Sequence, residues 1–347
     1  MDLTSAPTVV DSSVVAPAPV VAADWLRRRW LRLLGGLARP IVTDRELRVA
    51  LAFSAMIVTA LIGTLVAPLW LLILGPLVWG VPHLVADLRY LVVRPGYHRR
   101  PLLALAVGAP LLWVGLGGGL LWGFLGAGAA ALLARARLLP RLLALAALLA
   151  CGALLTWLGR TGDVVFAHAH NFIAIALWWL WRPRLGRLHW IPLALLAAAC
   201  VLLLGDAALA AAHATGGLDW FGGGMSLKYQ VWRLSPGIAP DLGLRLVLLF
   251  CFMQSLHYAI WLQLLPDEDR ARATPSTFRA SHAALRRDLG RLGLWLALTL
   301  ALGLALWAAY DLMRASHGYF RLARFHGHLE LAAGALLLLE ARPGPRA

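Results

Sequence analysis

Acidic and histidine side chains lie inside long apolar stretches of this sequence, where polar residues are rare. His83 precedes Asp87 by four residues in the stretch Trp79–Tyr90, and His326 precedes Glu330 by the same spacing. Residues four apart share one face of a helix, so each pair would point in one direction. An ionisable group in the middle of a membrane helix costs about 3 kcal/mol unless it is paired or bound. These residues therefore predict a buried functional site.

Two further apolar stretches carry histidines between these pairs. His168 and His170 occur in the segment FAHAHNF, and His257 is followed by Tyr258 in the segment FMQSLHYAIW. Residues two apart on a helix point about 200° away from each other, so only one of His168 and His170 is expected to face a shared site. The same limit applies to the two histidines of the segment FHGHLE near the C-terminus.

This combination of side chains suits a metal ion. Neutral imidazole is the commonest metal ligand in proteins, and carboxylates beside it suit iron or zinc. We predict a site for ferrous iron whose ligands are His83, His170, His257 and His326. The residues predicted to act beside the metal are Asp87, Glu330 and Tyr258. Either carboxylate could be a further ligand or could fix the tautomer of a histidine.

Other kinds of membrane protein use the same residue types. Two histidines on facing helices could be the axial ligands of a haem. A row of histidines and carboxylates could relay protons in a transporter, although no internal repeat relates the two halves of the sequence. In an assembly protein, the polar residues would only hold helices together. The sequence contains no P-loop, dinucleotide-binding fingerprint or nucleophile elbow.

The composition indicates which elements must position these residues. The chain of 347 residues is 61% hydrophobic and 14% charged, with 16 tryptophans and a formal charge of +15. Soluble domains of this length are far more polar, so we predict an all-α, polytopic membrane bundle. The positive charge is expected to come from arginines that flank membrane helices rather than from nucleic-acid binding. The three cysteines lie in apolar stretches and are expected to be buried thiols without a disulfide.

The apolar stretches are long enough for about ten transmembrane helices. With a cytoplasmic N-terminus, this number places most arginine clusters on the cytoplasmic side, as membrane topology favours. The C-terminus is then cytoplasmic too, and we expect the bacterial cytoplasmic (inner) membrane. Arg314, Arg321 and Arg324 are the exception, because they fall on the opposite side. The predicted spans are 45–66, 69–93, 101–116, 119–136, 140–158, 163–181, 189–212, 241–264, 289–312 and 318–340.

The remaining segments complete the predicted organisation. Residues 1–23 are expected to be a disordered tail without a signal peptide, and residues 24–40 a basic amphipathic helix at the membrane surface. Residues 41–341 are expected to form a single transmembrane domain. Within it, the loop 214–240 is apolar enough to fold back onto the bundle as a lid or interfacial piece, whereas the loop 267–288 is polar and expected to be solvated.

Two segments carry a resemblance to a known family. The segment GVPHLVAD resembles the G-x-P-H-x-x-x-D motif of the bacteriorhodopsin-related-protein (Brp/Blh) family of membrane β-carotene dioxygenases. The matching residues are Gly80, Pro82, His83 and Asp87. The later segment LFCFMQSLHY is similar to the family's last histidine region through Phe250 and Ser255.

The resemblance implies iron held by histidines from several helices and oxidative cleavage of a carotenoid. Only His83 matches a family ligand; the family's last two histidines fall on Gln254 and Tyr258, with His257 one position out of register. We expect a membrane-embedded, metal-dependent oxidoreductase, most like a non-haem iron oxygenase. Its partners would be O2 and a carotenoid or other apolar lipid that enters from the bilayer.

Overall fold

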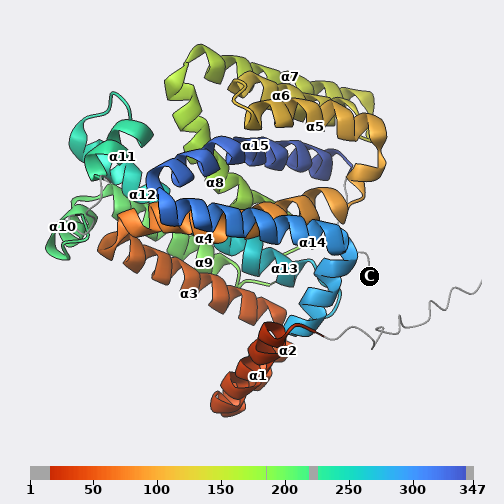
Figure 1. Cartoon of the computed structure of the whole chain (residues 1–347), viewed down its shortest axis with the longest axis vertical. Coiled ribbons are helices and arrows are strands. Elements are labelled where there is room, and N and C mark those ends of the chain that lie inside the picture. Colours follow the sequence, from red (N-terminus) through yellow and green to blue (C-terminus); the bar gives the residue numbers. More distant parts are fainter. Residues whose placement is uncertain (1–15, 185, 219–225, 341–347) are drawn as a thin grey trace, which may run out of the picture.

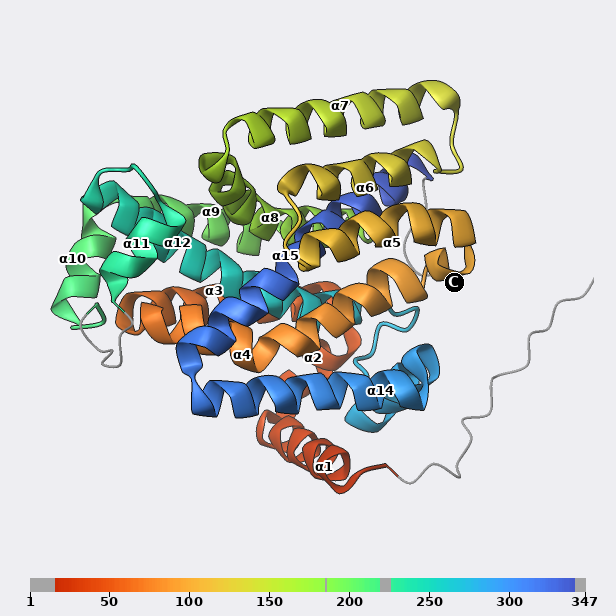
Figure 2. The ribbon, with the colours of Figure 1, turned by 45° about the horizontal axis from the view of Figure 1, so that its top comes forward.

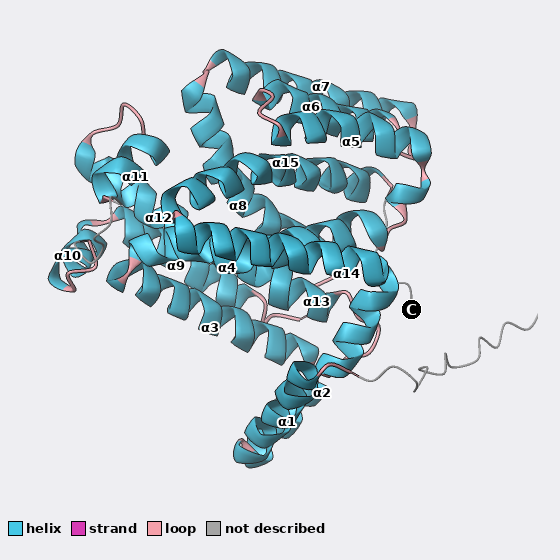
Figure 3. Cartoon of the chain, viewed as in Figure 1, coloured by secondary structure: helices cyan, strands magenta, loops and turns pink. Residues whose placement is uncertain are grey.

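The computed structural model of the protein describes residues 16–184, 186–218 and 226–340. All regular elements in these ranges are helical, as predicted (Figure 3). The α-helices are α1 (Ala18–Leu33), α2 (Ala38–Thr43), α3 (Arg45–Val66), α4 (Pro68–Asp87), α5 (Pro101–Gly115), α6 (Leu120–Leu132), α7 (Leu138–Trp157), α8 (Arg160–Leu180), α9 (Trp190–Leu204), α10 (Asp206–Ala214), α11 (Leu227–Leu234), α12 (Pro240–Ala259), α13 (Leu265–Glu268), α14 (Phe278–Tyr310) and α15 (Leu312–Leu339). Two π-helical segments, Leu88–Val93 and Ile260–Leu264, continue α4 and α12 without a break.

Six of the described helical segments, or seven with one bent pair, are long and apolar enough to cross a membrane. The protein is therefore a helical membrane bundle, but ten spans are not confirmed. The predicted spans 101–116 and 119–136 form α5 and α6, which have 15 and 13 residues. A bilayer requires about 20. The predicted span 189–212 consists of α9 and α10, which meet at a bend of 75°.

A glycine lies at the α9–α10 bend and another at the turn between α5 and α6. Gly205 adopts an extended backbone conformation between α9 and α10, with φ −89° and ψ 167°, which ends the ladder of helical hydrogen bonds. Gly117 adopts a φ of 109° between α5 and α6, in a region of conformational space that residues with a side chain rarely enter. The chain turns back there, so α5 and α6 form a helical hairpin.

The long helices run side by side in layers (Figures 1 and 2). In Figure 1, α5, α6 and α7 lie at the top, α15 and α8 lie beneath them, and α4, α14 and α3 form the lower part. α15 packs against α4, α5, α6, α8 and α14, whereas no residue of α14 is buried. The interior of the bundle therefore surrounds α15 and α12, and α14 covers it from one side.

The basic N-terminal helix differs from its prediction in extent and in contacts. α1 begins inside the predicted tail 1–23 and is separated from α2 by a short turn. Its apolar side is open, with Trp30 65% exposed. The helix is nevertheless attached to the bundle, because the buried Asp24 carboxylate accepts hydrogen bonds from the backbone N–H groups of Phe278 and Arg279. Asp24 thus satisfies free donors at the start of α14.

The polar segment 267–288, predicted to be a solvated loop, includes the end of α13 and the start of α14 and ties helix ends together. Asp267 forms an ion pair with Arg48 at 2.8 Å, and Asp288 forms one with Arg89 at 2.7 Å. The buried Glu268 carboxylate pairs with arginines of the α8–α9 connection. Arg89, which follows the first histidine pair in the sequence, therefore belongs to this ionic network and not to the histidine region.

The predicted lid is described in part. Within 214–240, α11 packs against α12, so this portion does lie on the bundle. The glycine-rich centre of the loop, at 219–225, lies outside the described residues, and so do 1–15 of the tail, residue 185 and 341–347.

The cysteines are all free thiols, as predicted, but only one of them is buried. Cys251 lies in the interior, Cys200 is partly buried and Cys151 is exposed. The expectation of a buried thiol is wrong for Cys151, because α7 is an outer helix of which only 11% is buried. An apolar stretch in a membrane protein does not distinguish the face toward lipid from the face toward protein.

Glycines let α15 approach its neighbours closely. A Cβ atom on Gly80 of α4 would lie 2.4 Å from the ring of Tyr319 on α15. A Cβ atom on Gly123 of α6 would lie 2.0 Å from the imidazole of His328. Both distances are far inside van der Waals contact, so only glycine fits. Polar side chains of α15 therefore lie directly against α4 and α6.

Candidate metal centre

Four helices each contribute one histidine to a cluster that is buried at two of its members and partly buried at the other two, His170 and His326. The centroid of the His83 ring on α4 lies 5.3 Å from that of His257 on α12 and 4.8 Å from that of His326 on α15. The His170 ring on α8 lies 5.2 Å from His257 and 5.0 Å from His326. The structure therefore brings together the four residues that the sequence suggested as metal ligands.

The other histidine of α8 points elsewhere. Nε2 of His168 lies 3.0 Å from the carbonyl oxygen of Leu234, and the ring packs edge-on against Phe250 with 5.0 Å between centroids. His168 is thus held by the chain around α11. Of the two candidates on α8, only His170 faces the cluster, as the helical period requires of one of them.

The second histidine of α15 also lies outside the cluster. His328 packs among aromatic rings, with its centroid 5.5 Å from that of Phe124 and 4.3 Å from that of Phe166. Its side chain is buried, and its Nδ1 lies 3.2 Å from the carbonyl oxygen of Arg324. His326 is therefore the residue of this pair that meets the other histidines.

Backbone contacts determine the tautomer of three imidazoles in the cluster. In each case Nδ1 contacts the carbonyl oxygen three residues earlier in its own helix, at 2.8 Å for His83 and 2.7 Å for His170, and likewise for His326. A carbonyl oxygen can only accept a hydrogen bond, so Nδ1 carries the proton and donates. The Nε2 atom of each ring then has a lone pair, which is the form in which imidazole binds a metal.

No group in the described part of the chain donates a hydrogen bond to the Nε2 lone pairs of His83 and His326. Nε2 of His83, Nε2 of His326 and both ring nitrogens of His257 are buried and have no hydrogen-bond partner in the described part of the chain. The ligand atoms of the three residues lie within 4.8 Å of one another. Bonds of about 2.1 Å to a metal hold two nitrogens no more than about 4.2 Å apart, so an ion requires a small closure of the cluster. Unsatisfied buried acceptors are costly, and a cation would satisfy them.

Two buried carboxylates flank the histidines. Oδ2 of Asp87 lies 3.6 Å from Nε2 of His83, and Oε1 of Glu330 lies 3.3 Å from Nε2 of His257. Glu330 Oε1 accepts the indole N–H of Trp261 at 2.7 Å, whereas neither oxygen of Asp87 has a hydrogen-bond partner among the described residues. A divalent cation beside these imidazoles would offset the charge of ionised carboxylates at Asp87 and Glu330.

Two tyrosines adjoin His83. The ring centroid of Tyr258 lies 4.7 Å from that of His83, and the hydroxyl oxygen of Tyr319 lies 3.4 Å from Nδ1 of His83. Neither Tyr319 nor Trp261 is among the site residues predicted from the sequence. Their spacing in the sequence places them on the same helix faces as the histidines: Tyr319 lies two helical turns before His326, and Trp261 lies one turn after His257. Aromatic residues at helical spacing are so common in membrane helices that this signal alone selects too many positions.

The helices that carry most of these residues change their winding beside the site. α4 ends at Asp87 and continues as the π-helix Leu88–Val93, and α12 passes into the π-helix Ile260–Leu264 two residues after His257. A π-helical insertion rotates the side chains that follow it relative to those before it, and such insertions are frequent at functional sites. On α12 this rotation accompanies the placement of Trp261 against Glu330.

A cavity of about 390 Å³ reaches the cluster. Ligand-binding cavities commonly measure about 300–1,000 Å³, with a mostly apolar lining and few polar groups. The histidines on the wall of this cavity are His170, His257, His317, His326 and His328. Its apolar wall includes Leu120, Phe166 and Phe250, and its basic residues are Arg233, Arg321 and Arg324. A ligand in the cavity would therefore contact the imidazoles directly.

Comparison with known proteins gives no match: no family model, curated protein or solved structure matches the chain. The resemblance to the Brp/Blh family is carried by the two short segments around His83 and Ser255. The chemistry of the centre must therefore be argued from its geometry.

Proposed function

We propose that the protein is a membrane-embedded, metal-dependent oxidoreductase of the non-haem iron oxygenase type, which uses O2 to oxidise a carotenoid or another apolar lipid. The observation that carries this proposal is the meeting of His83, His257 and His326 with unpartnered ring nitrogens in the interior of the bundle. His170 would complete the ligand set from α8. Imidazole ligands with nearby carboxylates are a donor set that suits iron.

A bound ferrous ion would supply the reaction with O2, which amino-acid side chains alone do not provide. The residues of the chain have other tasks. Asp87 and Glu330 balance the charge of an ion, and the indole N–H of Trp261 holds the Glu330 carboxylate in position. Burial of His83, His257 and the two carboxylates limits water on that side of the cluster, which strengthens these electrostatic interactions.

The cavity suits a substrate that is dissolved in the bilayer. Aromatic and aliphatic side chains on α6, α8 and α12 form much of its wall, including Leu120, Phe166 and Phe250. An apolar lipid is already concentrated in the membrane, so entry between helices requires no transfer through water. Tyr258 lines the cavity and lies beside His83, where it would orient a bound substrate relative to the histidines.

The geometry favours a single ion over two of the alternatives from the sequence, a haem and a proton relay. The axial ligands of a haem lie on opposite faces of the macrocycle. The ring centroid of His326 lies only 4.8 Å from that of His83 and 5.5 Å from that of His257, which leaves no room for a macrocycle between the rings. A proton relay needs donors and acceptors at about 2.7–3.2 Å. The contacts between histidines and carboxylates in this cluster are 3.3 and 3.6 Å.

We also propose that both termini face the cytoplasm of a bacterial cell, with the protein in the cytoplasmic membrane. The support is the arginine pattern of the helix connections. The short hairpin of α5 and α6 does not affect this assignment, because a hairpin adds two crossings or none. Labelling of single cysteines near either terminus with a membrane-impermeant reagent, in cells and in inverted vesicles, tests the orientation.

Metal analysis of purified protein tests the proposed centre. Protein loaded with ferrous iron without oxygen and freed of excess metal should contain one iron per chain. The variants His83→Gln, His257→Gln and His326→Gln should lose it. His98→Gln is the matched control, because His98 is exposed and lies outside the cluster. Wild-type protein without bound metal would overturn the proposal, and a Soret band would identify a haem protein instead.

The reaction is tested separately. Iron-loaded protein in lipid nanodiscs should consume O2 in the presence of β-carotene or another polyene lipid and release oxidised fragments that mass spectrometry detects. If the protein binds iron at the four histidines but oxidises no apolar lipid, the proposed metal centre stands and the proposed reaction is wrong.

A further inference from the structure

The cavity beside the histidine cluster has a basic end. Figure 1 shows α11 and the first turns of α12 and α15 at the same end of the bundle. Phe320 precedes His326 by six residues, which is about 9 Å along α15. Phe250 precedes His257 by seven residues, which is about 10 Å along α12. The part of the cavity near Phe320 therefore lies about 10 Å from the imidazoles, the length of several carbon–carbon bonds.

Arg233 differs from the other cavity arginines because no acceptor in the described part of the chain holds its charge. Nη2 of Arg324 lies 3.5 Å from the carboxylate of Asp163, and Nη2 of Arg321 donates to a backbone carbonyl at 3.2 Å. The Arg233 guanidinium instead lies 4.7 Å from the centroid of the Phe320 ring. Its Nε is buried and has no hydrogen-bond partner among the described residues.

The charge of Arg233 calls for an anion. Burial lowers the pKa of this guanidinium, but its ordinary pKa is so high that the group stays protonated at neutral pH. Arg233 is partly buried, so its charge is incompletely hydrated and a counter-charge beside it would be favourable. Guanidinium groups bind carboxylates and phosphates through two parallel N–H···O hydrogen bonds. The Phe320 ring beside the Arg233 guanidinium helps to orient its N–H groups for such a pair of hydrogen bonds.

Two neighbouring arginines are unusual for their place in the sequence. Arg321 and Arg324 interrupt the pattern in which arginines gather on the predicted cytoplasmic side. Both line the cavity together with Arg233 and His317. Recognition of an anionic ligand explains why basic residues occur at this end of α15, where topology alone disfavours them.

We propose that the cavity binds a single-chain amphiphile, whose carboxylate or phosphate lies at Arg233 and whose apolar chain extends toward the histidine cluster. A volume of about 390 Å³ is near the lower limit for ligand sites and suits one chain rather than a two-chain lipid. The identification of this ligand as the substrate rests on the proposed function and makes that substrate an acidic lipid. Binding itself requires no metal.

Equilibrium binding to metal-free protein in lipid nanodiscs tests the inference. The probes are dodecanoate, dodecyl phosphate, dodecanol and inorganic phosphate, with empty nanodiscs as the blank. Both anionic amphiphiles should bind at least tenfold more tightly than dodecanol, because a hydrogen-bonded charge pair contributes about one to two powers of ten in affinity. The tighter of the two identifies the head group. Inorganic phosphate that binds as tightly as dodecyl phosphate would contradict a role for the chain.

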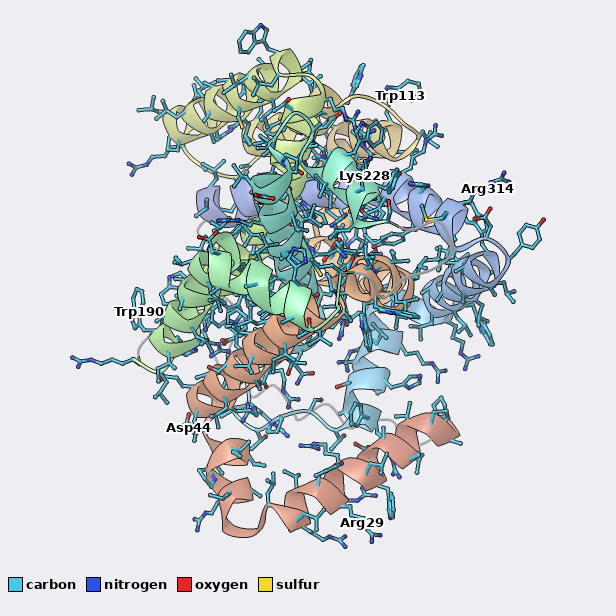
Figure 4. The ribbon with its side chains drawn as sticks, turned by 90° about the vertical axis from the view of Figure 1, so that its left-hand side faces the viewer. Arg29, Asp44, Trp113, Trp190, Lys228 and Arg314 are labelled. Carbon is cyan, nitrogen blue, oxygen red and sulfur yellow. The ribbon has the colours of Figure 1, made fainter. Side chains whose placement is uncertain are left out.

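Variants connect the binding to Arg233. Arg233→Gln should weaken dodecanoate and dodecyl phosphate about ten- to a hundredfold and leave dodecanol unchanged, and Arg233→Lys should restore part of the loss. Arg314→Gln is the matched control, since Arg314 lies in the first turn of α15, at the same end of the bundle, but has an 80% exposed side chain (Figure 4). Equal affinities for dodecanoate in the wild-type and Arg233→Gln proteins would overturn the inference.

Failure of this inference and failure of the proposed function give different results. Arg233→Gln should keep one iron per chain, which also shows that the variant is folded. Binding of dodecanoate that depends on Arg233 in a protein that takes up no iron would preserve the lipid site and refute the oxidoreductase. A protein that takes up iron but binds dodecanoate and dodecanol equally would refute the anionic lipid site and leave the proposed metal centre standing.

Discussion

Asp87 and His83 face one another across one turn of α4, with Oδ2 3.6 Å from Nε2, and neither atom has a hydrogen-bond partner in the described chain. Because Nδ1 of His83 donates to the carbonyl of Gly80, its Nε2 presents a lone pair to the carboxylate. Two buried acceptors in this arrangement destabilise the protein unless a proton or a metal cation lies between them. The metal ion proposed above would satisfy both atoms at once.

Asp87→Asn is expected to change the metal-free and iron-loaded proteins in opposite directions. Without metal, removal of a buried carboxylate that lacks a donor should raise the melting temperature. With iron, loss of the carboxylate beside His83 should weaken metal affinity about 10- to 100-fold and reduce the stabilisation that iron provides. Thermal unfolding with and without ferrous iron measures both effects. A shift of both states in the same direction would contradict this role for Asp87.

The two histidines of α8 should respond differently to the same substitution. His170→Gln is expected to weaken iron binding, because His170 lies in the cluster. His168→Gln should leave iron affinity unchanged and cost about 1 kcal/mol of stability through its hydrogen bond to Leu234. Iron titration followed by thermal unfolding separates the two effects. Equal loss of iron in both variants would show that the cluster is not formed as described.

Gly80→Ala should destabilise the bundle, because the added Cβ would lie 2.4 Å from the Tyr319 ring and force α4 and α15 apart. Overpacking of this kind costs about 1–3 kcal/mol. Gly303→Ala is the control: nothing lies within 4 Å of its added Cβ in α14, and alanine favours the helix by up to about 1 kcal/mol. Melting temperatures of the two variants should therefore move in opposite directions. A neutral Gly80→Ala would argue against the close approach of α15.

Glu268→Gln should destabilise the protein strongly without affecting iron binding. Glu268 is 1% exposed and pairs with Arg184 and Arg182, so its loss leaves buried cations without their counter-charge and costs about 3–5 kcal/mol. Asp311→Asn removes an ion pair to the exposed Arg314 and retains a good helix cap, so it should cost no more than about 1 kcal/mol. Similar losses in both variants, measured by thermal unfolding, would contradict the burial of this network.

The amino-acid sequence identified the class of fold and many of the site residues through local patterns. Apolar length indicated a helical membrane protein, because a helix must cover the bilayer with apolar side chains. The spacing of His83 and Asp87, and of His326 and Glu330, follows from the helical period within a single element. The same period also limited His168 and His170 to one cluster residue, without indicating which.

Only the tertiary structure decided how each helix is rotated about its own axis. That rotation depends on packing between segments far apart in the chain, such as the contact of Gly80 with Tyr319, and it selected His170 over His168. The same long-range packing placed Trp261 against Glu330 and Arg233 against Phe320. Apolar length likewise could not separate α5 and α6 from full spans, because a short hairpin that packs against α15 has the composition of a membrane helix. The sequence by itself thus determined a helical membrane protein and which way side chains point within one helix. The structure decided which side chains from different helices meet, because packing between helices is a property of the whole chain.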